Sequence, residues 1–154
     1  SGLAEVDLRK QLITCSSRLR HRGPDWSGYL VIEADPNKGT THPHGIAHER
    51  LAIMDPESGS QPLVSTDDTV IVAANGEIYN YKELYHDLKH KYTPKTGSDC
   101  EVILPLYEEY GASVELPKRL RGMFSFILYF GPFVFILTRE SIIIILYYFF
   151  GSYL

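Results

Sequence analysis

The chain has 154 residues, a formal net charge of −4, a hydrophobic fraction of 44% and a charged fraction of 22%. This length suffices for one globular domain with a real core. The mild acidity, without a long basic stripe, argues against nucleic acid as the main partner. Two cysteines are too few for a disulfide scaffold, and no signal peptide is visible. We therefore expect a reduced, intracellular, cytoplasmic protein.

Hydrophobic spacing in the first half of the chain predicts one helix followed by strands. An apolar stripe at helical spacing predicts an amphipathic helix near residues 5–20. The apolar runs that follow predict strands over 29–32, 45–54 and 70–74, with a polar loop over 33–44. The stripe of the helix consists of Leu8, Leu12, Cys15 and Leu19.

The second half begins with helical patterns. We expect a helix over 81–91 and another that starts at Ser98. Glu101 lies three residues after Ser98, which matches a capping box, and Gly111 is placed to end this helix. A short helix near 113–120 should follow.

The tail is almost wholly apolar over 123–137 and 142–149. A membrane hairpin is one interpretation, but Gly131 and Pro132 split the first run, and both pieces are shorter than the roughly 20 residues of a spanning helix. Their β-branched and aromatic residues favour buried strands instead. Helices at both ends of a set of strands predict a layered α and β domain with largely antiparallel sheets, not attached to a membrane.

An arginine, an aspartate and an Asn-Gly pair suggest a site for a free amino acid. The guanidinium of Arg50, near the end of a predicted strand, matches a carboxylate with two parallel hydrogen bonds. Asp99, at a predicted helix start, could accept hydrogen bonds from an ammonium group. Asn75 and Gly76 offer a side-chain amide donor beside an unhindered backbone N–H, as an oxyanion hole requires.

Each feature also has an ordinary structural explanation. Arg50 could be a surface arginine paired with an acid, and Asp99 could simply suit the helix dipole. Asn75 and Gly76 together are common in plain turns. His48 is better explained as a structural hydrogen-bonding residue. Neither Cys15 nor Cys100 is nominated as a nucleophile, and no P-loop or metal-ligand spacing is present.

Six motifs occur in an order that resembles the glutamine amidotransferase domain of glutamine-hydrolysing asparagine synthetases. The resemblance extends over about residues 5–129. The motifs are residues 20–25 (RHRGPD), 48–53 (HERLAI), 59–63 (GSQPL), 75–80 (NGEIYN), 98–103 (SDCEVI) and 121–126 (RGMFSF).

The resemblance implies a role for each site residue. Arg50 would bind the α-carboxylate of glutamine, and Glu77 and Asp99 would hold its α-amino end. Asn75 and the N–H of Gly76 would form the oxyanion hole, and residues 51–54 would supply neighbouring backbone contacts. The complete implied set is Arg50, Leu51, Ala52, Ile53, Met54, Asn75, Gly76, Glu77 and Asp99.

The resemblance also implies a fold and a nucleophile. The fold would be α+β, of the N-terminal-nucleophile hydrolase type, a four-layer sandwich of two antiparallel sheets between helical layers. The nucleophile would be an N-terminal cysteine located upstream of Ser1, so that no catalytic nucleophile belongs to this chain. Residues 1–154 would then form a glutaminase domain without its first strand, inactive by itself.

The partners follow from the same resemblance. Glutamine would be the substrate, and no cofactor or metal is expected in this domain. ATP and magnesium would act in a C-terminal synthetase domain that amidates aspartate; a homodimer is left open. After Tyr129 the sequence departs from the family, since Arg139 and Glu140 stand where Arg-Asp is expected. A catalytically dead glutamine-binding module and a related amidotransferase are the alternatives.

Overall fold

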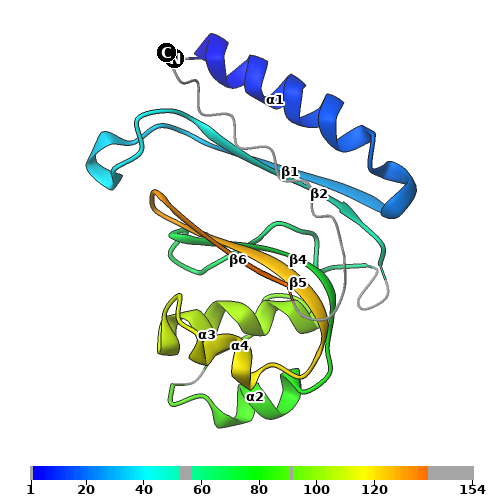
Figure 1. The fold of residues 1–154 in the computed structure, drawn as a ribbon, viewed down its shortest axis with the longest axis vertical. Coiled ribbons are helices and arrows are strands. Elements are labelled where there is room, and N and C mark those ends of the chain that lie inside the picture. Colours follow the sequence, from blue (N-terminus) through cyan, green and yellow to red (C-terminus); the bar gives the residue numbers. More distant parts are fainter. Residues whose placement is uncertain (1, 53–56, 91, 139–154) are drawn as a thin grey trace.

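The computed structural model describes residues 2–52, 57–90 and 92–138 (Figure 1). It contains a long first helix, two antiparallel sheets and a group of short helices. In chain order the elements are α1 (Gly2–Ser17), η1 (Arg20–Arg22), β1 (Trp26–Ile32), η2 (Pro36–Lys38), β2 (His44–Arg50), β3 (Leu63–Val64), β4 (Val70–Ile78), α2 (Tyr81–Asp87), η3 (Asp99–Val102), α3 (Ile103–Tyr110), α4 (Glu115–Arg119), β5 (Gly122–Phe130) and β6 (Phe133–Thr138).

The strands form a two-stranded sheet and a four-stranded sheet, and every described pairing is antiparallel. β1 pairs with β2, and the larger sheet has the order β3-β4-β5-β6. β4 pairs with β5 along its whole length, from Val70 opposite Phe130 to Ile78 opposite Gly122. The prediction of an α and β domain with antiparallel sheets is confirmed.

The two sheets face each other, and each has helices on its other side. In Figure 1, α1 lies over β1 and β2, while α2, α3 and α4 lie beneath the larger sheet. Ile46 of β2 packs with Ile71, Ala73 and Tyr129 between the sheets. A larger apolar cluster, in which Phe124 is fully buried, fills the space between the larger sheet and the short helices. Burial of both faces of the larger sheet explains the continuous apolar runs of β4 and β5.

Alternation along β4 decides where its side chains point. Ala74 and Ile78 belong to the cluster on the helical side, whereas Ile71 and Ala73 belong to the cluster between the sheets. Because successive side chains of a strand alternate between its faces, Asn75 and Glu77 share the face that looks toward β1 and β2.

Several predicted boundaries need correction. The strand expected over 45–54 ends at Arg50, and the helix expected over 81–91 ends at Asp87. The strand expected over 70–74 continues to Ile78, so the plain turn offered as the ordinary explanation of Asn75 and Gly76 is wrong: both lie inside β4 and pair with β5. Tertiary pairing overrides the turn preference of this dipeptide.

The predicted capping box is also wrong. Ser98 precedes η3 but makes no side-chain cap bond. The Glu101 carboxylate instead accepts hydrogen bonds from the Tyr92 hydroxyl, the Lys95 N–H, and the N–H and hydroxyl of Thr96, all at 2.5–3.0 Å. These donors of the preceding loop occupy both carboxylate oxygens. The end of α3 at Gly111 is as predicted.

The apolar tail forms strands as far as the structure describes it. The predicted strands on either side of Gly131 and Pro132 are confirmed, and β5 and β6 pair as a hairpin. The expectation that both are buried holds for most of β5 but not for β6, in which Phe133 and Ile136 are exposed. The second apolar run, 142–149, lies outside the described residues. Among the helices of the described part, none has the length and apolarity needed to cross a bilayer.

Candidate functional site

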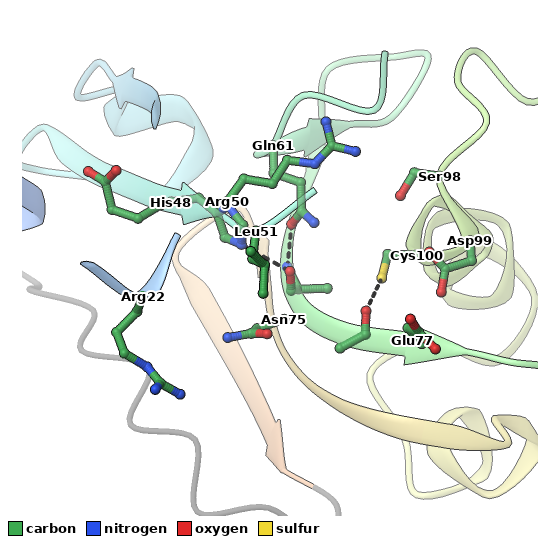
Figure 2. Close-up of a pocket in the computed structure, with 13 residues that line it drawn as sticks. Arg22, His48, Arg50, Leu51, Gln61, Asn75, Glu77, Ser98, Asp99 and Cys100 are labelled. Atoms are coloured by element: carbon green, nitrogen blue, oxygen red, sulfur yellow. Dashed lines mark hydrogen bonds between the residues drawn. The ribbon is translucent and has the colours of Figure 1, made fainter. Parts of the chain in front are cut away.

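A pocket of about 130 Å³ opens where the end of β2, the middle of β4 and the start of η3 meet (Figure 2). Six of the nine predicted site residues line it, although they come from three separate stretches of sequence. The lining residues are Arg22, His48, Glu49, Arg50, Leu51, Gln61, Ala74, Asn75, Gly76, Glu77, Ser98, Asp99 and Cys100.

Arg50 is the last residue of β2 and is only 6% exposed. Its Nη1 donates a hydrogen bond to the carbonyl oxygen of Ser58, at 2.6 Å. The alternative of an ordinary surface arginine therefore does not apply. A buried guanidinium whose orientation is fixed by a backbone carbonyl is well suited to bind a planar carboxylate.

Asp99 opens η3 and is 5% exposed. Its Oδ2 accepts a hydrogen bond from the N–H of Ile78 at 2.5 Å, which ties the start of η3 to the end of β4. The bond fixes the direction of the carboxylate. A buried acid with one anchored oxygen can present the other oxygen to a cationic group.

Asn75 and Gly76 are exposed in the middle of β4. Gly76 has a φ of +126°, and a Cβ at this position would lie 2.0 Å from the carbonyl oxygen of Met123. Only glycine fits this backbone. The N–H groups of Ala74 and Ile78 both bind acceptors at the edge of β4 away from β5. Alternation along the strand therefore directs the Gly76 N–H toward the same edge, which faces the pocket.

His48 and Gln61 also line the pocket, and the sequence did not assign them to the site. His48 Nε2 lies 3.0 Å from the carbonyl oxygen of Ala74, which agrees with the structural role expected for this histidine. Gln61 Oε1 accepts a hydrogen bond from the N–H of Ala74 at 2.5 Å. The nearest signal in sequence is that both belong to the motifs at 48–53 and 59–63.

Glu49 lines the pocket, but its carboxylate is bound to residues of α1, η1 and β1. Its carboxylate accepts hydrogen bonds from the hydroxyls of Ser16 and Ser27, each at 2.5 Å, and from Arg20 at 3.1 Å. These hydrogen bonds and the arginine charge lower its pKa against the opposing effect of burial. Glu49 therefore joins α1 to the β1–β2 sheet.

Cys100 lies at the pocket wall without the properties of a nucleophile. It is 2% exposed, and its Sγ lies 3.9 Å from the carbonyl oxygen of Gly76. Burial, and then the negative charge of Asp99, raise the pKa of this thiol well above its usual value. Cys15 lies on α1, outside the pocket lining. Neither cysteine forms a disulfide.

Three predicted site residues are not placed in the pocket. Ala52 does not line it; its N–H donates to Oδ2 of Asp25 at 2.8 Å. Ile53 and Met54 lie outside the described residues. Within the described ranges, no cluster of histidine, cysteine, aspartate and glutamate side chains could hold a metal ion.

Similar known proteins indicate which family the chain belongs to. A family described as "Glutamine amidotransferase domain" matches residues 2–144. The chain belongs to this family. The amidotransferase domain is also 54% identical to "Asparagine synthetase [glutamine-hydrolyzing]" of Zea mays over 130 residues, which is 82% of this chain and 20% of that protein.

Other plant proteins give the same result for this amidotransferase domain. It is 51% identical over 130 residues to asparagine synthetase [glutamine-hydrolyzing] 2 of Oryza sativa subsp. japonica, covering 82% of the chain and 20% of the relative. It is 52% identical over 121 residues to asparagine synthetase [glutamine-hydrolyzing] 1 of Arabidopsis thaliana, which is 78% of this chain and 18% of the relative. The chain thus spans about a fifth of the length of these curated relatives.

Proposed function

We propose that this chain is the glutaminase domain of a glutamine-dependent asparagine synthetase, which hydrolyses glutamine to glutamate and ammonia for the ATP-dependent amidation of aspartate. The observation that carries the proposal is the pocket that gathers Arg50, Asn75, Gly76 and Asp99. A buried cation and a buried anion suit the two charges of a free amino acid. The donors on β4 line the same pocket.

The roles follow from the chemistry of each group. Arg50 binds the α-carboxylate, and Asp99 together with Glu77 binds the α-ammonium group. The side-chain amide of Asn75 and the N–H of Gly76 stabilise the oxyanion that forms when the side-chain amide of glutamine is attacked. Of the segment that follows β2, Leu51 lines the pocket and contributes a contact to the ligand.

The nucleophile in this proposal is an N-terminal cysteine that precedes Ser1 in the complete protein. Its thiolate attacks the amide carbon of glutamine, ammonia leaves, and water hydrolyses the resulting glutamyl thioester. The buried Cys100, whose pKa is raised, does not fit this role.

The fold we propose is that of the N-terminal-nucleophile hydrolases. Two antiparallel sheets that face each other, with α1 on one side and α2 to α4 on the other, support it (Figure 1). In this proposal ATP, magnesium and aspartate bind the synthetase domain of the complete chain, and the protein acts in the cytoplasm.

The test is to supply the full-length protein with glutamine, aspartate, ATP and magnesium, and to measure glutamate and asparagine together. We expect both products from glutamine, and asparagine alone when ammonia replaces glutamine. Glutamate without asparagine would indicate another amidotransferase. Glutamine binding without glutamate formation would indicate a module that is catalytically dead.

A further inference from the structure

One edge of β4 faces the pocket. Among the described residues, no strand pairs with the backbone N–H and C=O groups along the second half of this edge. On this side β4 pairs with β3 only, through Ile71 and Val72. Further along β4, the backbone groups of Ala74, Gly76 and Ile78 point to this edge. An uncovered edge exposes N–H and C=O groups that need partners.

Side chains take the place of the strand. The N–H of Ala74 donates to Gln61 Oε1 at 2.5 Å, and its carbonyl oxygen lies 3.0 Å from His48 Nε2. At the other end of the edge, Asp99 accepts a hydrogen bond from Ile78. Side chains therefore bind both the N–H and the carbonyl oxygen of Ala74, the residue that directly precedes Asn75.

The chemistry of the His48 ring defines its contact with Ala74. A carbonyl oxygen only accepts, so Nε2 must carry the hydrogen. Nδ1 is buried and has no hydrogen-bond partner among the described residues. Burial, joined by the positive charge of Arg50, lowers the pKa of His48 to about 4, although the hydrogen bond to Ala74 and the charge of Glu49 act in the opposite direction. The ring is therefore neutral at physiological pH, and its bond to Ala74 is constant above the acid range.

We propose that His48 and Gln61 are positioning residues of the glutaminase reaction: they clamp Ala74 from two segments and thereby hold Asn75 and Gly76 in the geometry of the oxyanion hole. This inference rests on the proposed function. Neither residue touches the reacting atoms in this account; both act through the backbone of β4. Small displacements of such donors are costly, because stabilisation of the developing charge depends on their placement.

The test compares variants in the full-length protein. His48→Leu and Gln61→Leu each remove one bond to Ala74, while His48→Gln keeps a donor and Gln61→Glu keeps an acceptor. We expect the leucine variants to lower kcat for glutamine hydrolysis by about tenfold, with little change in KM, since one lost contact to a buried backbone group corresponds to about this factor. The conservative variants should recover most of the rate.

Two further readouts separate positioning from a merely structural role. Inhibition by an aldehyde analogue of glutamine, which forms a tetrahedral adduct with the catalytic thiolate, should weaken in parallel with kcat. Hydrogen exchange of the segment 70–78 should become faster in Gln61→Leu, because the N–H of Ala74 loses its acceptor. This exchange measurement does not require activity.

Asn80→Ala is the matched control. Asn80 likewise binds two backbone groups, the carbonyl oxygen of Arg119 at 2.9 Å and the N–H of Arg121 at 2.8 Å, but it does not line the pocket. We expect it to lower stability and leave kcat and inhibitor affinity unchanged.

The outcomes are distinguishable. If the wild-type protein releases no glutamate from glutamine, the proposed function fails, and this inference fails with it. If Asn75→Ala loses glutaminase activity but His48→Leu and Gln61→Leu retain wild-type kcat and inhibitor affinity, the positioning role is overturned and the proposed function survives. Leucine variants that are no worse than Asn80→Ala in kcat would lead to the same conclusion.

Discussion

Arg50 and Asp99 bring a buried guanidinium and a buried carboxylate to the same pocket, from the end of β2 and the start of η3. Each is anchored to backbone, Arg50 through the carbonyl oxygen of Ser58 and Asp99 through the N–H of Ile78. Opposite charges held by separate anchors can bind the two charged ends of one small zwitterion. The site is thus built before the ligand arrives, which reduces the entropic cost of binding.

Asn75→Ala tests the oxyanion hole. Removal of one preorganised donor should lower kcat for glutamine hydrolysis by about 10²–10³-fold, because the interaction is strongest in the transition state. KM for glutamine should change little. Steady-state kinetics of the full-length protein measure both values. A variant with wild-type kcat would remove Asn75 from the site.

Gly76→Ala tests the backbone of β4. The added methyl group would collide with the Met123 carbonyl oxygen, and φ at this position is +126°. We expect a loss of stability of about 3 kcal/mol or more, measured by denaturant unfolding, together with loss of glutaminase activity. Gly111→Ala is the control, since φ there is +65° with nothing within 4 Å of the added carbon. It should cost about 1 kcal/mol.

Glu101→Gln tests the loop before η3. Both oxygens of this carboxylate accept hydrogen bonds, so an amide would place its NH₂ group against donors on one side. We expect a destabilisation of about 1–3 kcal/mol in thermal or denaturant unfolding. Glu115→Gln, which changes an exposed residue paired with Lys118, should stay within about 0.5 kcal/mol of wild type. Equal effects of the two variants would contradict the buried network.

Acid should destabilise the domain partly through His48. Its pKa is lowered from 6.5 to about 4, so the unfolded chain binds a proton on this residue that the folded chain does not bind between these pH values. The contribution is fully present above pH 6.5 and is lost as the pH falls toward 4. The difference in unfolding free energy between wild type and His48→Gln should therefore change by up to about 3 kcal/mol as the pH falls from 6.5 to 4. A constant difference between them would show that His48 titrates normally.

Local patterns predicted the elements well but not all their contacts. The stripe containing Leu8 and Leu12 forms the buried face of α1, and the apolar run over 123–137 forms the hairpin of β5 and β6. The plain turn offered as the ordinary explanation of Asn75 and Gly76 was wrong, because their preference for turns is local and their pairing with β5 is not. The hydrogen bonds of the Glu101 carboxylate were not predicted for a similar reason, since their donors lie in a loop without a periodic pattern.

The candidate site shows the same limit. Arg50 and Asp99 could be nominated because their motifs resemble a known family, and the structure brings both to one pocket. Gln61 and His48 could not be assigned to it from sequence alone, because their contacts with Ala74 depend on how β2 and the segment before β3 meet the edge of β4. Contacts between segments that are far apart in the sequence produce no residue spacing by which they could be predicted.

The most direct test of the account is the nitrogen-source dependence of Arg50→Lys in the full-length protein. Lysine keeps the positive charge but loses the planar fork that matches a carboxylate. Asparagine synthesis from glutamine should fall by about tenfold to a hundredfold in kcat/KM, while synthesis from ammonia should stay at the wild-type rate, because ammonia does not use this pocket. An equal loss with both nitrogen sources would contradict the assignment of the pocket to glutamine.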